Sequence, residues 1–394
     1  MAYHLEFRSY QFPLKKPLTT NYGSWSVREG IIIRLINELG NTLEQVSYGE
    51  IAPIPWFGSE TMAEALQFCQ QLPSRITHEE IWTIPDRLPA SQFGFGSAWE
   101  NLEITPNSLP NPEIIPNPLA KGALNIVPPF FLAKRRVSAG ARGVPSCYSY
   151  LLPTGIAALE SWQLPWQQGY RTFKWKIGVE DCHQELDQLQ QLVNLLPVGA
   201  KLRLDANGGL NLEQAKLWLG ECDRNCDHWK RLNKAETPNL LKKGALEIVP
   251  PLKRGARGDR LQQPTAKIEF LEQPLPVEDF RDLLILADRY DTPIALDESV
   301  ATLGQLKTCY AQGWRGIFVI KPSIAGYGDR LREFCQNYSL DAVFSSSLET
   351  AIGRNHALKL AQELSNSDRA LGFGVDHWLE IDQETLIKQL WQGH

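Results

Sequence analysis

Three acidic residues occupy similar places in successive segments of the second half of the chain. Asp205 ends the run "LRLD", Glu272 ends "FLE" and Asp297 ends "IALD". Short apolar runs of this kind predict strands, and three carboxylates gathered at neighbouring strand ends would repel one another and have raised pKa values. A hard divalent cation removes that conflict. Because the set offers only oxygen atoms, without His or Cys, it indicates Mg²⁺, with Mn²⁺ as the alternative.

Two lysines flank the acidic residues along the chain. Lys176 ends "FKWK" and Lys321 follows "IFVI". An amine beside a metal-bound carboxylate suits proton chemistry at the neighbouring carbon, because it can remove the α-proton while the cation holds the resulting enediolate. Lys174 shares a strand face with Lys176. A solvated polar stripe is the commoner meaning of such a pair, but inside a barrel Lys174 would disfavour the charged form of Lys176, as a general base requires.

These side chains need a fold that brings strand ends together. From about residue 146, short apolar runs alternate with helical stretches at least seven times, which indicates a parallel sheet covered by helices. No glycine fingerprint follows the first strand, so the pattern predicts a modified (β/α) TIM barrel rather than a dinucleotide-binding sheet. The catalytic groups of such barrels lie at the C-terminal ends of the strands, where the acids and lysines are expected.

The rest of the chain divides around this barrel. Residues 1–111 give short strands and then helical patterns, which predicts a small α+β capping domain. We expect the catalytic barrel at residues 144–376 and a C-terminal segment, 377–394, that packs back toward the capping domain. A chain of this length holds both domains comfortably.

Two similar stretches interrupt this organisation. "KGALNIVPP" at 121–129 is repeated as "KGALEIVPP" at 243–251, and Arg- and Gly-rich residues follow each copy. Two copies cannot form a stacked repeat, which needs several units. We therefore interpret 112–143 and about 233–265 as surface inserts that play no part in the chemistry.

Composition restricts the partners of the protein. The 394 residues carry a formal net charge of -5, which gives no basic surface for nucleic acid or an anionic membrane. The beginning of the chain lacks the apolar core of a signal peptide, and Arg34 interrupts the aliphatic run at 31–33, so no membrane insertion is expected. We expect a small-molecule carboxylate as the partner. The oligomeric state is left open.

The cysteines indicate a reducing compartment. Their number is seven, an odd count spread over the chain, which fits free thiols and a cytoplasmic location better than a disulfide framework. Cys222, Cys226 and His228 are close enough for a metal clip, but a fourth ligand at suitable spacing is missing. The surrounding stretch has helical periodicity, so we interpret it as a helix with incidental thiols.

The motifs "FKWKIG", "LRLDAN", "FLEQP", "LDES" and "VIKPS", in this order, resemble the enolase superfamily and its muconate-lactonizing branch. The similarity covers about residues 3–376 apart from the two inserts, and includes "SYGEIAP" in the capping domain. It implies that a loop around residues 19–27 closes over the barrel mouth. It also implies Asp205, Glu272 and Asp297 as metal ligands, Lys176 and Lys321 as acid/base groups, and Lys174, Arg203, Asn207 and Glu298 as supporting residues.

Within that branch, "SSSLETAIG" is similar to the o-succinylbenzoate synthases. In those enzymes the serine-rich strand end and its backbone amides hold the substrate's carboxylate side, which implies substrate-binding roles for Ser345, Ser346 and Ser347. The implied reaction is the syn-dehydration of 2-succinyl-6-hydroxy-2,4-cyclohexadiene-1-carboxylate to 2-succinylbenzoate in menaquinone or phylloquinone synthesis. Lys176 would take the α-proton and return it to the departing hydroxyl, and Lys321 would stabilise the intermediate from the opposite face.

Three other functions fit parts of the pattern. Racemisation of an N-succinylamino acid or epimerisation of a dipeptide would use both lysines as opposed bases, although the last strand end, "GFGVDHW", offers only Asp376 to bind a free amino group. A class I aldolase would form a Schiff base on Lys321, but has no use for the three acids. A non-catalytic barrel would not retain such costly buried charges.

Overall fold

The structure is a computed structural model that describes residues 2–37, 45–103, 147–235, 266–366, 368–375, 378 and 382–391, without the side chains of 103 and 226–235. The expected inserts, 112–143 and about 233–265, lie outside these ranges except for 233–235, which end a helix. Asp376 also lies outside them, as do the side chains of Cys226 and His228. None of the described helices combines the length and the apolar content needed to cross a membrane.

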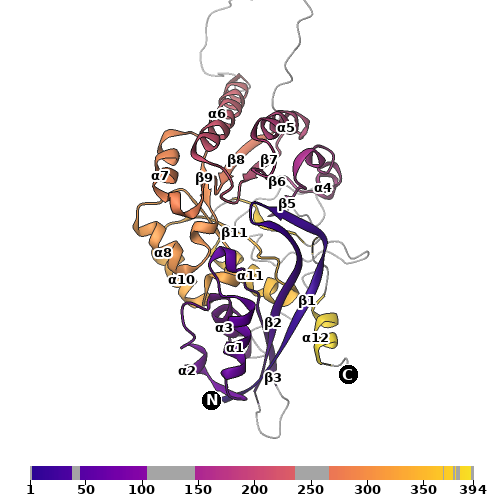
Figure 1. Ribbon diagram of the computed structural model, residues 1–394, viewed down its shortest axis with the longest axis vertical. Helices are drawn as coiled ribbons and strands as arrows, with labels where there is room; N and C mark the ends of the chain where they lie inside the picture. The colour runs from indigo at the N-terminus through magenta and orange to yellow at the C-terminus, as the bar shows by residue number, and fades with distance from the viewer. Residues whose placement is uncertain are drawn as a thin grey trace, which may run out of the picture.

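The N-terminal part of the chain is a four-stranded antiparallel sheet with helices packed on one face (Figure 1). Its order is β3-β2-β1-β4, and β1 and β2 form a long hairpin that turns at residues 21 and 22. The strands are β1 (Ala2–Thr20), β2 (Gly23–Asn37), β3 (Gln45–Ile51) and β4 (Arg75–Thr77), and the helices are η1 (Pro55–Phe57), α1 (Met62–Gln71), α2 (His78–Ile81) and α3 (Pro89–Glu103). Thr61 and Thr77 begin α1 and α2 with reciprocal capping boxes, which are local sequence signals.

The second part is a parallel eight-stranded barrel surrounded by helices, in the order β11-β10-β9-β8-β7-β6-β5-β12. Its strands are β5 (Tyr148–Leu151), β6 (Thr172–Lys176), β7 (Lys201–Asp205), β8 (Lys267–Glu272), β9 (Ile294–Leu296), β10 (Ile317–Ile320), β11 (Asp341–Phe344) and β12 (Leu371–Gly374). The expected (β/α) barrel with an α+β capping domain is confirmed. Strand and helix alternation was sufficient for this prediction because each apolar run pairs with the next one along the chain.

The helices of the barrel follow the strands in turn. They are η4 (Gly155–Leu159), α4 (Gln163–Gln168), α5 (Cys182–Leu195), α6 (Leu212–Ala235), η5 (Val277–Asp279), α7 (Phe280–Arg289), η6 (Glu298–Val300), α8 (Leu303–Ala311), α9 (Pro322–Ala325), α10 (Gly328–Asn337) and α11 (Ala351–Leu364). The helix expected around Cys222 is present as α6, and this cysteine is buried and joined in no disulfide to another described residue. It therefore contributes to packing like any small apolar group.

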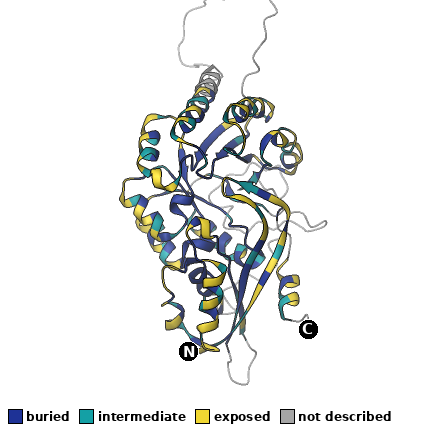
Figure 2. Ribbon diagram, viewed as in Figure 1, coloured by how far each residue is buried: buried dark blue, intermediate teal, exposed yellow. Residues whose placement is uncertain are grey.

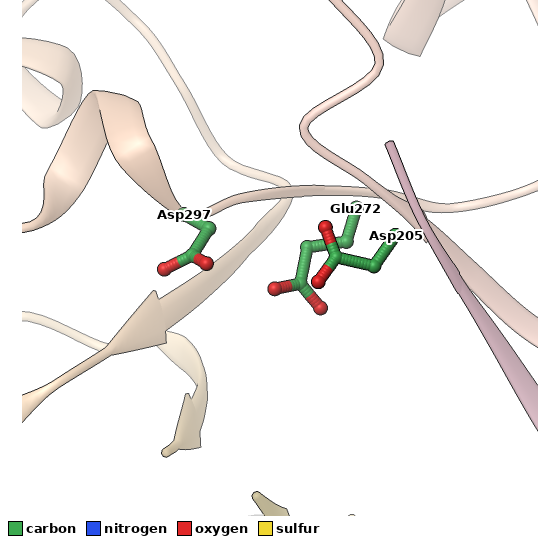
Figure 3. Close-up of side chains that lie close together, drawn as sticks. All are labelled: Asp205, Glu272 and Asp297. Atoms are coloured by element: carbon green, nitrogen blue, oxygen red, sulfur yellow. The ribbon is translucent and has the colours of Figure 1, made fainter. Parts of the chain in front are cut away.

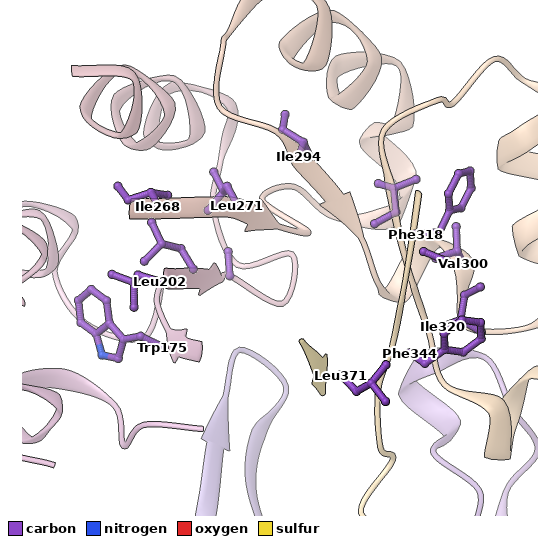
Figure 4. Packing of buried hydrophobic residues seen from close by; sticks show 14 of the residues in the cluster. Trp175, Leu202, Ile268, Leu271, Ile294, Val300, Phe318, Ile320, Phe344 and Leu371 are labelled. Carbon is purple, nitrogen blue, oxygen red and sulfur yellow. The ribbon is translucent and has the colours of Figure 1, made fainter. Parts of the chain in front are cut away.

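The main core lies between the barrel strands and these helices (Figures 2 and 4). Alternate residues of the strands, among them Trp175, Leu204 and Phe344, point outward into it and are fully buried. Removing such a side chain from water stabilises the fold by roughly 1.5–3 kcal/mol. The other strand positions point into the barrel, so this packing fixes which polar groups face the barrel axis.

The C-terminal helix α12 (Gln383–Trp391) lies against the capping sheet, beside β1 (Figure 1). Trp391 Nε1 donates a hydrogen bond of 2.8 Å to Glu6 Oε2, and its ring packs edge-on against Tyr48 with 5.7 Å between ring centroids. The two ends of the described chain are thereby joined, which fixes the sheet relative to the barrel.

The barrel closes where β11 meets β12. Ser345 and Gly372 form a parallel bridge, and Ser346 N donates to Gly372 O at 3.1 Å. A Cβ atom on Gly372 would lie 2.3 Å from Ser345 Oγ and 2.8 Å from Ser345 Cβ. A glycine is therefore required at this position by the closeness of the two strands.

We expect Gly372→Ala to lower the free energy of unfolding by about 1–3 kcal/mol, because the added methyl group forces the closing strands apart. Urea unfolding followed by circular dichroism measures the change. Gly220→Ala in α6 is the control, since nothing lies within 4 Å of its added Cβ, and alanine there should be neutral or stabilising. Equal stability of Gly372→Ala and the native protein would contradict the proposed packing.

Candidate active site

The three acids meet at one end of the barrel. Asp205 and Glu272 are the last residues of β7 and β8 and pair in register, and Asp297 directly follows β9. One carboxylate oxygen of each lies within 4.8 Å of the others, and all three side chains are buried (Figure 3). Because β7, β8 and β9 are parallel neighbours, their C-terminal ends bring the three groups together.

The chemistry of this set fits a hard divalent cation. Burial, together with the charge of Asp205, raises the pKa of Glu272 to about 7. Burial also raises the pKa of Asp297, whereas Lys174 and Lys176 overcome the effect of burial and lower the pKa of Asp205. Three buried carboxylates at this spacing can bind Mg²⁺ through their oxygen atoms, since the cation removes the repulsion between their charges.

Lys174 lies between two of the acids. Its Nζ is 2.7 Å from Asp205 Oδ2 and 2.7 Å from Glu272 Oε1. Burial lowers the pKa of Lys174, but the charges of Asp205 and Glu272 outweigh burial and raise it above its usual value. The structure thus assigns Lys174 to neutralising carboxylates, in addition to its place beside Lys176.

Lys176 is held on the same side of the site. Its Nζ donates to Asp205 Oδ2 at 2.8 Å and to Asn207 Oδ1 at 2.5 Å. Asn207 has a φ of 44°, a left-handed conformation that asparagine tolerates better than most residues, and its amide donates to Glu298 Oε1 at 2.8 Å. Lys176 therefore has a fixed position, and Glu298 orients it through Asn207.

Lys321 stands on the opposite side of the site. It follows β10, which lies four strands from β6 in the eight-stranded ring. Its ammonium forms an ion pair with Asp297, and its Nζ lies 4.2 Å from the ring centroid of Phe57, a residue of the capping domain. Two amines thus face the centre of the barrel mouth from opposite strands.

Gln273 is a supporting residue that the sequence analysis missed. Its Oε1 accepts from the backbone N of Asp297 at 3.0 Å and of Ser299 at 3.2 Å, and its Nε2 donates to Ser299 Oγ and Leu275 O. It fixes the backbone next to Asp297 from the neighbouring strand end. Its position in "LEQP", directly after a predicted ligand, was the available signal.

Arg203 lies deeper in the barrel than the other predicted residues. Its Nε donates to Glu269 Oε2 at 2.7 Å, and its guanidinium carbon is 4.9 Å from the Phe270 ring centroid. No described contact joins it to the three acids. Its expected supporting role in the site stays a prediction.

The site opens into a cavity of about 200 Å³ between the two domains. The barrel contributes the three lysines, Asn207, Asp297 and the three serines, and the capping domain contributes Leu18, Tyr22, Trp25, Trp56 and Phe57. The loop expected around residues 19–27 is the tip of the β1–β2 hairpin, and it forms part of this lining. Its closure over a substrate stays a prediction. The cavity is thus charged on one side and apolar on the other, as suits an unsaturated carboxylate.

The serines differ in what they can offer a ligand. Their backbone N–H groups already donate within the protein, from Ser345 to Ile320 O at 2.8 Å, from Ser346 to Gly372 O at 3.1 Å and from Ser347 to Glu349 Oε2 at 2.6 Å. The expectation that these amides hold a carboxylate therefore differs from the structure. Pairing with the neighbouring strands uses the amides of Ser345 and Ser346, and the side chain of Glu349 uses that of Ser347.

Ser346 is the most accessible of the three. Its side chain is half-buried, whereas Ser345 and Ser347 are 8% and 2% exposed. Ser345 Oγ donates to Gly372 O, and Ser347 Oγ to Glu349 Oε2. Ser346 Oγ accepts from Leu348 N at 2.9 Å, which leaves its own proton to donate into the cavity.

Comparisons with known proteins agree with this geometry. The family described as "MenC, N-terminal domain" matches residues 3–102, and "Enolase C-terminal domain-like" matches 256–390. The o-succinylbenzoate synthase of Thermosynechococcus vestitus is 37% identical over 98% of each chain. An N-succinylamino acid racemase of Thermus thermophilus is 24% identical over 90% of this chain and 81% of that protein.

A solved structure is similar over the whole chain. It is the crystal structure of o-succinylbenzoate synthase from Thermosynechococcus elongatus BP-1 complexed with Mg in the active site. The TM-score is 0.72 and the sequence identity 35%, over 99% of this chain and 100% of that one.

We expect Mg²⁺ to stabilise the protein, because an ion that binds only the folded state adds about 2.7 kcal/mol at a concentration of about 100 times its Kd. A thermal melt with and without Mg²⁺ measures the effect. It should be smaller at pH 6 than at pH 8, since Glu272, with a pKa of about 7, must lose its proton to bind.

Glu272→Gln should remove most of this Mg²⁺ effect. Glu60→Gln is the matched control, because Glu60 is a buried glutamate that accepts from Ala90 N and Ser91 N in the capping domain. A full Mg²⁺ effect in Glu272→Gln would show that the ion binds elsewhere.

Proposed function

Because the chain belongs to the o-succinylbenzoate synthase family of the enolase superfamily, we propose that it dehydrates 2-succinyl-6-hydroxy-2,4-cyclohexadiene-1-carboxylate to 2-succinylbenzoate. The protein is thus a carbon–oxygen lyase, and Mg²⁺ is its cofactor. The observation that carries the proposal is the pair of lysines on opposite sides of a buried acidic triad, within one cavity. The product belongs to menaquinone or phylloquinone synthesis.

The acidic triad would hold the cation that offsets the negative charge formed during the reaction. Asp205, Glu272 and Asp297 would hold Mg²⁺, which offsets the negative charge that develops on the substrate carboxylate when the neighbouring carbon loses its proton. Lys174 contacts two of these carboxylates, those of Asp205 and Glu272, and its charge favours their ionised forms. The substrate carboxylate therefore enters a site whose charges are already arranged.

Lys176 would be the acid/base group. Its amine takes the proton from the ring carbon that bears the carboxylate, and the electron pair of that C–H bond enters the ring as the bond to the hydroxyl breaks. Lys176 then returns the proton to the departing oxygen, which leaves as water from the same face. Asn207 and Asp205 hold the amine for both steps.

Lys321 would act on the opposite face by its charge. Its ion pair with Asp297 and its position over Phe57 hold the ammonium at the rim of the cavity. The apolar residues of the capping domain exclude water from the same space, which strengthens the electrostatic effect of both lysines.

Ser346 is the serine that we assign to the substrate. It is half-buried at the cavity, and its hydroxyl has a proton to donate, whereas Ser345 and Ser347 are committed to contacts within the protein. A hydroxyl here can hold a carboxylate oxygen of the substrate by a charge-assisted hydrogen bond.

We further propose that the protein works in the cytoplasm on this small carboxylate, without nucleic acid. No disulfide joins any of the cysteines in the described part of the chain, which fits a reducing compartment.

We expect Lys176→Met and Lys321→Met each to lower kcat by about 10²-fold or more, because each removes a group that acts on the reacting ring. The ultraviolet change on aromatisation measures turnover. Lys201→Met is the control, since Lys201 lies at the other end of β7 and contacts Glu269. Near-native kcat in either active-site variant would overturn its role.

An isotope-exchange assay separates the dehydratase from the racemase alternative. Native protein is incubated with N-succinylamino acids in ²H₂O, and deuterium at the α-carbon is followed by mass spectrometry. Deuterium incorporation without dehydration of the diene would favour a racemase, in which the two lysines act as opposed bases.

Ser346→Ala should raise KM roughly ten-fold with a much smaller change in kcat, because a hydrogen bond to a charged group is lost on binding. Steady-state dehydration measures both constants. Ser345→Ala, which loses only the contact of its hydroxyl with Gly372, should raise KM less. A larger effect in Ser345→Ala would reassign the substrate contact to Ser345.

A further inference from the structure

The capping sheet carries three buried polar side chains near its contact with the segment that follows β11. They are Tyr10 from β1, Arg28 from β2 and Glu50 from β3, and their exposed fractions are 4%, 1% and 0%. Arg28 and Glu50 form hydrogen bonds with the segment of residues 346–353, which leads from the serines into α11, and Tyr10 donates to Glu50. We call these three residues the sheet clamp.

Glu50 supplies the N-terminal cap of α11. Thr350 is the residue before this helix, and its own side chain makes no capping hydrogen bond among the described contacts. Glu50 Oε1 accepts from Thr350 N at 2.9 Å, and Glu50 Oε2 accepts from Gly353 N at 2.8 Å and from Thr350 Oγ1. A carboxylate from another domain thus satisfies backbone donors that a helix normally satisfies with its own capping residue.

Two glycines leave room for the clamp. A Cβ on Gly353 would lie 2.8 Å from Glu50 Oε2, and a Cβ on Gly30 would lie 2.5 Å from Tyr10 Oη. Neither glycine has a positive φ, so the backbone conformation does not require them. Tyr10 Oη donates to Glu50 Oε1. The packing is therefore built around this buried carboxylate.

Arg28 holds the other end of the segment. Its Nε donates to Leu348 O at 3.1 Å, while its Nη1 and Nη2 donate to Pro53 O and Ala52 O. Leu348 has a φ of 60°, which a residue with a side chain adopts only when its surroundings hold it. Leu348 N in turn donates to Ser346 Oγ. Arg28 is thus two hydrogen bonds away from the hydroxyl assigned to the substrate.

We propose that Glu50 and Arg28 are positioning residues for substrate binding, which fix Ser346 and Leu348 at the cavity from the capping domain without touching the substrate. The inference rests on the proposed function. Its physical basis is that a segment fixed at both ends has less conformational freedom to lose when the substrate binds. The capping domain then controls affinity by two routes, the apolar lining and the clamp.

The test compares Glu50→Gln with Glu60→Gln. Both variants remove a buried, helix-capping carboxylate of the capping domain, but Glu60 caps α3, through Ala90 N and Ser91 N. Loss of the clamp should raise KM roughly ten-fold with kcat nearly unchanged, whereas Glu60→Gln should leave KM at the native value. Both should lower Tm, so Tm is recorded for each. An unchanged KM in Glu50→Gln would overturn the proposal.

A double variant tests whether Glu50 acts through the serine. If it does, Glu50→Gln combined with Ser346→Ala should have the KM of Ser346→Ala alone. Both changes act on the contact between Ser346 and the substrate, and Ser346→Ala has already removed that contact. Effects that multiply would show that Glu50 acts on substrate binding elsewhere, and would overturn the assignment to Ser346.

Hydrogen exchange gives a readout that needs no turnover. Amides of residues 346–353 should exchange faster in Glu50→Gln than in Glu60→Gln, and equal rates would overturn the clamp. Native protein that fails to dehydrate the diene would refute the proposed function, while these rates would still decide the clamp. If Glu50→Gln does not fold, Tyr10→Phe removes one donor to the same carboxylate and should show smaller changes in the same directions.

Discussion

The structure depends on three like charges held without water at one end of a barrel. Asp205, Glu272 and Asp297 are buried within a few ångströms of one another, and burial acts to raise the pKa of each. The surrounding positions reduce that cost: Lys174 and Lys176 contact Asp205, and Lys321 pairs with Asp297. The site is therefore one coupled set of charges, in which no member can be changed without affecting the others.

The two domains contribute different kinds of side chain to the active site. The parallel strands of the barrel end at one height and supply the charges, because only parallel neighbours bring successive strand ends together. The capping sheet supplies the apolar side of the cavity and the buried Glu50 that caps α11. The register of the barrel strands thereby fixes the positions of the charged groups. Packing between the two domains determines the access to the cavity and the contacts offered to the substrate.

Much of the site could be predicted because its residues lie at the C-terminal ends of strands. Lys176, Asp205 and Glu272 are last residues of their strands, and Asp297, Lys321 and Ser345 follow theirs directly. A side-chain period of two and a repeated strand–helix unit place such residues without knowledge of the packing. The same period of two places Arg203 on the strand face of Asp205, but it does not show that Arg203 lies deeper and pairs with Glu269.

The sequence by itself determined the barrel, the order of its strands and the chemical groups at the strand ends, since these follow from local periodicity. The tertiary structure decided how those groups are used. Strand pairing in the barrel occupies the backbone amides of Ser345 and Ser346, and Gln273 fixes the backbone at Asp297. Glu50 caps a helix whose N-cap residue, Thr350, lies 300 residues later in the chain. Such hydrogen bonds depend on which segments meet when the barrel closes and the two domains pack, and no local pattern in the sequence records that.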